Sequence, residues 1–114
     1  MIVHVVLFRP RATLGPEQRR AIVQSLIAAM RQLPMVRGCR LGRRIKHGLP
    51  GYEQAMREDY EYALVLEFES VEHLRVYLQH AAHSQLGQLF SDGAGAALAY
   101  DYEMAALDEG ERLI

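Results

Sequence analysis

The segment IVHVVLF at residues 2–8 is apolar and mostly β-branched, interrupted by a single histidine. This composition predicts a β-strand, and Arg9-Pro10 ends it. Successive side chains of a strand point to opposite faces of a sheet, and here both faces are apolar. Ile2, Val6 and Phe8 lie on one face, and Val3, Val5 and Leu7 lie on the other. We therefore expect both faces of this strand to be covered.

Around this strand the sequence predicts two helical regions and three further strands. Leu14-Gly15-Pro16 opens the first helix, because proline suits the first helical position, and Pro34 ends it. One face of that helix carries Ile22, Leu26, Met30 and Leu33. Ser70 is the expected N-cap of the second helical region. That region runs to about Gln79 and resumes over about Ser84–Ser91, and the strands are Val36–Lys46, Tyr60–Glu69 and Leu98–Ala106.

The resulting order, β-α-β-β-α-β, predicts a ferredoxin-like α+β fold with one antiparallel sheet and the helices on one face. Residues 47–59, which contain two glycines and a proline, form the longest irregular stretch. We expect one domain over residues 1–107 and a charged, frayed tail over residues 108–114.

The sheet face opposite the helices is also apolar, because Ala63 and Val65 of the Tyr60–Glu69 strand extend the Val3, Val5 and Leu7 face. In a monomer an antiparallel sheet usually keeps its open face polar. An apolar patch across two strands indicates burial against another chain. The sequence therefore predicts a homodimer that forms through this sheet face.

Composition excludes several classes of function. The chain has 114 residues, 50% of them hydrophobic, and a net charge of -1, so neither nucleic acid nor an anionic membrane is an expected partner. Its single cysteine, Cys39, excludes an internal disulfide and a zinc site of several cysteines. No apolar run approaches the roughly 18 residues that a membrane span needs, and no signal-peptide pattern is visible. We expect a cytoplasmic protein.

Three of the five histidines cluster with a tyrosine in HLRVYLQHAAHSQLG. His73, Tyr77 and His80 share one side of a continuous helix. His83 lies about 240° around an ideal helix from Tyr77, so the two side chains meet only if the helix breaks between them.

His4 is the polar interruption in the first strand and shares a face with Ile2, Val6 and Phe8. A buried imidazole without a partner costs about 1–3 kcal/mol, so His4 needs a hydrogen bond. Two interpretations stay open: a core histidine bonded to backbone or tyrosine, and a histidine of a functional site.

IVHVVLF, the strand and cap YALVLEFES at residues 62–70, and Tyr77-x-x-His80-x-x-His83, in this order, resemble the stress-responsive dimeric α/β-barrel (Dabb) family. The resemblance covers about the first 105 residues. It implies a ferredoxin-like protomer that dimerises sheet to sheet into a barrel, with the helices outside.

The family includes olivetolic acid cyclase, a plant polyketide cyclase that needs no metal or organic cofactor. By this resemblance Tyr77 and His83 match its catalytic pair, and His4 matches a pocket histidine of the first strand. Tyr62 and His80 fall where it has further pocket histidines. The family segment has proline where this chain has Ala81.

The chemistry of these residue types agrees with the resemblance. A neutral histidine is a suitable base for a proton next to a carbonyl, and a tyrosine hydroxyl can stabilise the charge that develops on oxygen. We expect His83 to be the base, Tyr77 the acid or oxyanion donor, and His4 an orienting group. An apolar pocket for a hydrophobic carbonyl or aromatic compound would be lined by Val6, Leu64, Leu66, Phe68 and Leu86.

Three alternatives remain. The chain could be a non-enzymatic stress-associated or ligand-binding dimer whose Tyr77 and His83 form only a structural bond. It could be a monooxygenase-like barrel that works without a cofactor or binds haem. His80 and His83, joined by His73 or His4, could ligate zinc, although we expect no metal site and no cofactor.

Overall fold

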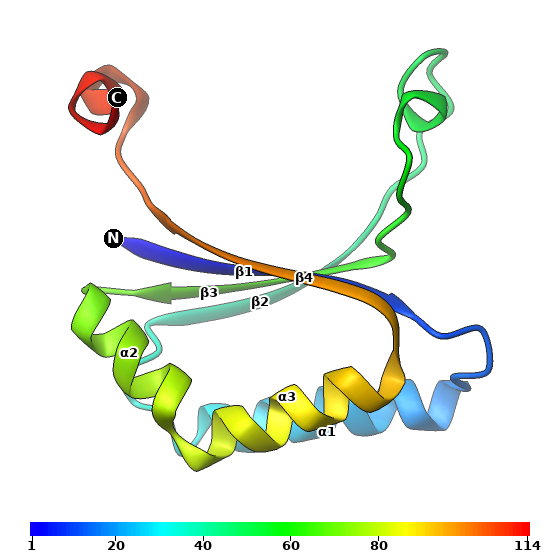
Figure 1. Ribbon diagram of the computed structural model, residues 1–114, viewed down its shortest axis with the longest axis horizontal. Helices are drawn as coiled ribbons and strands as arrows, with labels where there is room; N and C mark the ends of the chain where they lie inside the picture. The colour runs from blue at the N-terminus through cyan, green and yellow to red at the C-terminus, as the bar shows by residue number, and fades with distance from the viewer.

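The computed structural model describes residues 1–114 and confirms the predicted ferredoxin-like fold. Four antiparallel strands form one sheet in the order β2-β3-β1-β4, and the helices cover one face of it (Figure 1). The second helical region is two helices. The elements are β1 (Ile2–Pro10), α1 (Pro16–Met30), β2 (Gly38–Arg43), η1 (Glu53–Ala55), β3 (Tyr62–Phe68), α2 (Val71–Gln79), α3 (Ala81–Gly93), β4 (Ala94–Glu103) and η2 (Leu107–Leu113).

β1 lies between β3 and β4 in the sheet, so both of its edges are paired with neighbouring strands. Its register pairs His4 with Leu66 on β3 and with Asp101 on β4. Residues paired across antiparallel strands share a face, so these side chains lie on the helix side of the sheet.

The core lies between the sheet and the helices. Leu33, Leu66 and Phe68 are its most completely buried large side chains. The alternation predicted for β3 is confirmed, because Leu64, Leu66 and Phe68 all belong to this core.

The second helical region is interrupted at His80, which lies between α2 and α3. Ser70 caps the start of α2 as predicted, accepting a hydrogen bond from the His73 amide. The backbone of His80 is extended, with ψ of 144°, and its Nδ1 accepts a hydrogen bond from the Ala82 amide at 3.0 Å. This side-chain cap starts a new helix and compensates for the missing proline next to it. As a result α3 begins at Ala81, earlier than the predicted Ser84.

Strand β4 also begins earlier than predicted, at Ala94 and not at Leu98. Glycine and alanine have low β-propensity, so the segment AGAALA gives little local signal for a strand. Pairing with the end of β1 overrides that preference, because Phe8 pairs with Ala97 and Arg9 with Ala96.

The open sheet face is more extensive than the sequence indicated. Val3, Val5 and Leu7 of β1 pair with Tyr102, Tyr100 and Leu98 of β4, which places these six side chains on the face away from the helices. The two tyrosines and Leu98 are exposed in the single chain. A broad apolar and aromatic surface is therefore open to solvent unless another molecule covers it.

Two segments rise beyond the ends of the sheet on this open side, residues 44–61 and residues 104–114 (Figure 1). Within residues 44–61, the Asp59 carboxylate accepts hydrogen bonds from both Arg44 and Lys46. The second contains the 3-10 helix η2 over part of the segment that the sequence predicts to be a frayed tail. Arg112 holds it by pairing with Glu103 at 2.7 Å and bonding the Met104 carbonyl. No helix is both long and apolar enough to cross a membrane.

Candidate active site

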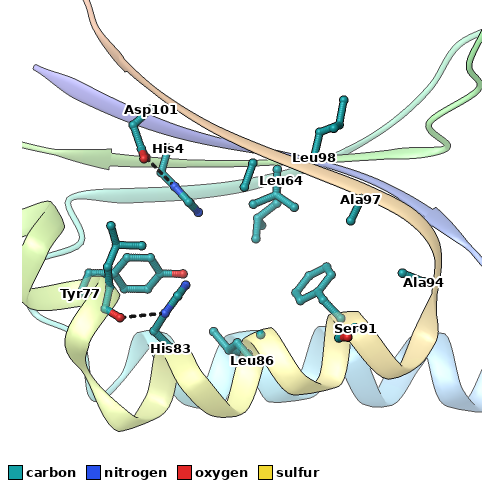
Figure 2. A pocket seen from close by; sticks show the side chains of 15 residues that line it. His4, Leu64, Tyr77, His83, Leu86, Ser91, Ala94, Ala97, Leu98 and Asp101 are labelled. Atoms are coloured by element: carbon teal, nitrogen blue, oxygen red, sulfur yellow. Dashed lines mark hydrogen bonds and ion pairs between the residues drawn. The ribbon is translucent and has the colours of Figure 1, made fainter.

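A cavity of about 590 Å³ lies between the helix side of the sheet and helix α3. Fifteen residues line it, and ten of them are hydrophobic. Figure 2 shows the imidazole and phenol groups gathered at one end, with Ala94, Ala97, Leu98 and Ser91 toward the other. Binding sites for small molecules have this character, with a mostly apolar wall and a few converging polar groups.

The polar end combines residues from four elements, with His4 on β1, Asp101 on β4, Tyr77 on α2 and His83 on α3. The Tyr77 ring centroid lies 4.8 Å from that of His83 and 5.7 Å from that of His4. The two imidazole centroids are 6.5 Å apart. The helix break at His80 thus brings Tyr77 and His83 together, as their spacing in the sequence requires.

His4 is 5% exposed, and its Nδ1 lies 2.6 Å from Oδ1 of Asp101. An ionised carboxylate only accepts hydrogen bonds, so Nδ1 of His4 carries the hydrogen. Its Nε2 is then left for the cavity, toward which Figure 2 shows it pointing. The two interpretations of His4 therefore combine, because its hydrogen bond is satisfied and it also lines the cavity.

The imidazole of His83 is fixed by the backbone at the end of α2. Its Nδ1 lies 3.1 Å from the carbonyl oxygen of Leu78. Because a carbonyl only accepts, Nδ1 donates and the lone pair belongs to Nε2. Burial lowers the pKa of His83 below its ordinary 6.5, and the hydrogen bond to Leu78 opposes that shift. His83 is therefore neutral near pH 7 and able to accept a proton.

Tyr77 is 3% exposed and packs against Phe68, with ring centroids 5.3 Å apart. Burial raises the pKa of Tyr77 to about 12, and Cys39 and Asp101 contribute less to the shift. The hydroxyl therefore keeps its hydrogen at neutral pH and serves as a donor. Figure 2 shows it directed into the cavity between His4 and His83.

The structure places three of the predicted pocket side chains on the cavity wall, Val6, Leu64 and Leu86. Leu66 and Phe68 do not line it, because they are 0% and 1% exposed within the core.

Two polar residues expected in the pocket also lie elsewhere. The hydroxyl of Tyr62 accepts a hydrogen bond from Arg19 at 3.1 Å, beside a separate cavity next to α1. His80 does not line the main cavity, because its imidazole caps α3.

Sequence reasoning missed Asp101, the partner of His4. The alternation in the sequence of β4 placed Asp101 on the opposite face from Tyr100 and Tyr102. It did not show which strand β4 would pair with. The small residues Gly87, Ala97 and Ala99, which also line the cavity, carried no signal because they contribute so little side chain.

The zinc alternative requires several ligands in one place. The structure contains no group of three or more histidine, cysteine, aspartate or glutamate side chains arranged to hold a metal ion. Nδ1 of His80 accepts a hydrogen bond from the Ala82 amide, whereas Nδ1 of His83 bonds to the Leu78 carbonyl oxygen.

Residues 2–104 match the family model described as the stress responsive A/B barrel domain. No curated protein matches the chain. Among solved structures, a protein from Arabidopsis thaliana is similar with a TM-score of 0.79 and 19% identity, covering 94% of this chain and 98% of that one.

Two further solved structures resemble this chain. A dimeric ferredoxin-like protein from Thermobifida fusca gives a TM-score of 0.71 at 20% identity, covering 90% of each chain. A hydroxynitrile lyase from Passiflora edulis gives a TM-score of 0.79 at 13% identity, covering 91% of this chain and 93% of that one. At these identities the likeness establishes a shared fold.

Proposed function

This chain belongs to the stress-responsive A/B barrel domain family, and we propose that it is an enzyme that removes a proton next to the carbonyl group of a hydrophobic substrate, using no metal or organic cofactor. The observation that carries the proposal is the meeting of two imidazoles and a phenol at one end of a mostly apolar cavity. Structural packing alone does not require three such groups to face open space.

His83 is the proposed base. Its Nε2 takes a proton from the carbon next to the carbonyl, and the electron pair of the broken C–H bond forms a carbon–carbon double bond. The π pair of the carbonyl moves onto oxygen, which gives an enolate and a protonated His83.

Tyr77 is the proposed donor to the enolate oxygen. Its hydroxyl stays protonated, so it can donate a hydrogen bond that strengthens as negative charge develops. The apolar cavity wall strengthens this interaction further, because little solvent screens it.

His4 is the proposed orienting group. Asp101 holds the His4 ring in place, and Nε2 of His4 can form a hydrogen bond with a polar group of the substrate. In a substrate with a conjugated double bond, return of the proton from His83 to the far carbon of the conjugated system would isomerise the substrate. Attack of the enolate carbon on a second carbonyl of the same molecule would close a ring, as in a polyketide cyclase, and protonated His83 would give its proton to the alkoxide formed.

The active protein is proposed to be a homodimer joined through the open sheet face. The apolar surface that includes Val5, Leu7, Leu98, Tyr100 and Tyr102 supports this, and a similar fold occurs in a dimeric protein from Thermobifida fusca. Pairing two such faces would remove this apolar area from water.

The test is exchange of carbonyl-adjacent protons for deuterium, because it detects enolate formation without knowledge of the natural substrate. Proton NMR follows a panel of hydrophobic ketones and diketones in deuterium oxide. We expect wild-type protein to accelerate exchange, and His83→Ala and Tyr77→Phe each to lose on the order of 10²-fold or more.

Tyr52→Phe is the matched control, since it removes one hydroxyl from a tyrosine that is 58% exposed and outside the cavity. Added imidazole should partly restore exchange in His83→Ala. If Tyr77→Phe and His83→Ala exchange at the wild-type rate, the proposal is wrong and the ligand-binding alternative takes its place.

A further inference from the structure

A second, smaller cavity lies beside helix α1 on the helix side of the sheet, and we call it the α1 cavity. Its volume is about 250 Å³, and Phe90 is the only one of its lining residues that also lines the main cavity. Seven of its nine lining residues are hydrophobic, and the other two are Arg19 and Arg20. The α1 cavity therefore joins an apolar interior to positively charged groups, apart from the proposed active site.

The guanidinium of Arg19 is held beside the α1 cavity by three hydrogen bonds. Its Nε donates to the Leu14 carbonyl oxygen at 3.1 Å, and its Nη1 donates to Glu61 at 3.0 Å and to the Tyr62 hydroxyl at 3.1 Å. A guanidinium has five N–H donors in a fixed arrangement, so both N–H groups of Nη2 are left without a protein acceptor. The group is thus fixed in orientation and keeps two donors for a ligand.

The hydroxyl of Tyr62 supplies a further donor. Because its oxygen accepts from Arg19, its own hydrogen remains available for another acceptor. Arg20 is exposed and forms no ion pair, whereas Glu61 balances the charge of Arg19. One uncompensated positive charge beside several unused donors suits an anion, and a carboxylate has the acceptor geometry that arginine recognises.

The apolar wall of the α1 cavity is rich in aromatic rings. Phe8 and Phe90 pack edge to face with ring centroids 5.0 Å apart, and Tyr62 contributes a third ring. Aromatic rings prefer edge-to-face and offset contacts with one another, so another aromatic ring is a favourable occupant. A volume of about 250 Å³ is below the roughly 300–1,000 Å³ of sites for drug-sized ligands, so the occupant is small.

We propose that the α1 cavity is a second binding site, which takes a small aromatic carboxylate. The carboxylate accepts hydrogen bonds from Arg19 and Tyr62, and Arg20 adds positive charge. The aromatic ring lies against Phe8 and Phe90. This site does not depend on the proposed function, because it uses none of the groups assigned to proton transfer.

The test is a titration of the full chain with benzoate, followed through the methyl signals of its NMR spectrum. These signals report on the two cavities separately. Ile22, Val23, Leu26 and Leu41 line the α1 cavity, and Val6, Leu64, Leu86 and Leu98 line the main cavity. Benzoate should shift the first set far more than the second. Benzamide has the same ring without the charge and should bind at least about tenfold more weakly.

Two variants test the proposed donors. Tyr62→Phe removes the available hydroxyl and should raise the Kd for benzoate about tenfold. Arg20→Gln changes an exposed side chain, so the fold is kept, and should raise the Kd about two- to fivefold. Tyr52→Phe and Arg57→Gln make the same changes at exposed positions outside the α1 cavity and should leave the Kd unchanged.

Three results would each overturn the proposal. The first is a titration in which benzoate shifts no methyl signals of the α1 cavity, or shifts mainly those of the main cavity. The second is equal affinity for benzoate and benzamide. The third is an unchanged Kd for benzoate in both Tyr62→Phe and Arg20→Gln.

Discussion

His4 and Asp101 lie 97 positions apart in the chain, yet Nδ1 of His4 lies 2.6 Å from Oδ1 of Asp101. The pairing of β1 with β4 places them opposite each other on the helix side of the sheet. The carboxylate fixes the His4 tautomer and stabilises any positive charge that the ring acquires. It also gives a buried histidine the partner that its position requires.

Replacing Asp101 with asparagine should reduce activity far more than stability. The amide lacks the negative charge and can turn its NH2 group toward His4, which favours the wrong tautomer. We expect kcat/KM for deuterium exchange to fall on the order of 10²-fold, less than the roughly 10⁴-fold loss when the histidine is itself the base. Glu103→Gln, the next carboxylate on the same face of β4, is the control. Equal deuterium-exchange rates in Asp101→Asn and Glu103→Gln would contradict the orienting role of Asp101.

The pH profile should show His83 acting as a base with a lowered pKa. Protonation removes the base, so kcat/KM should fall as the pH drops, with the midpoint below 6.5 because burial lowers the pKa of His83. Tyr77, with its pKa raised to about 12, should cause no loss near the ordinary tyrosine value of 10.0. Exchange rates across this range test both limits, and an acidic midpoint above 6.5 would count against His83.

A charge at the centre of the open sheet face should separate the dimer. Val5 pairs with Val65 on one side and Tyr100 on the other. We expect Val5→Asp to sediment as a monomer at micromolar concentration, because dimerisation would bury an unpaired carboxylate. Val76→Asp, on an exposed position of α2, should remain dimeric. Wild-type protein that sediments as a monomer would disprove the sheet-face dimer.

The core contribution of β3 should be measurable at Leu66, which is 0% exposed. Leu66→Ala removes buried methyl groups and leaves a cavity, so the free energy of unfolding should fall by about 2–5 kcal/mol. Leu41→Ala, at a side chain 47% exposed, should cost much less. Urea denaturation at one fixed protein concentration compares them, since dimerisation makes apparent stability concentration-dependent. Similar losses in the two variants would refute the burial argument.

His80 should act as a positioning residue through its cap on α3. His80→Ala should lower the free energy of unfolding by about 0.5–2 kcal/mol, the usual effect of removing an N-cap. It should also reduce deuterium exchange, because α3 carries His83. Asparagine is a good N-cap, so His80→Asn should restore both stability and exchange. Failure of asparagine to restore exchange would point to a role for the imidazole beyond capping.

Much of the fold could be predicted from local patterns. The apolar, β-branched composition of IVHVVLF and the alternation in residues 62–68 identified two neighbouring strands of the sheet, and Ser70 identified the start of α2. Such patterns repeat every two or four residues, so they can be read from neighbouring positions alone. They also indicated an apolar second sheet face.

The sequence by itself determined the element order, the ferredoxin-like fold and the candidate residues His4, Tyr77 and His83. Only the tertiary structure decided how they meet. The register of β4 against β1 paired His4 with Asp101, packing removed Leu66 and Phe68 from the cavity wall, and the cap at His80 turned His83 toward Tyr77. These outcomes depend on contacts between distant parts of the chain or on one side-chain hydrogen bond, which no local periodicity encodes.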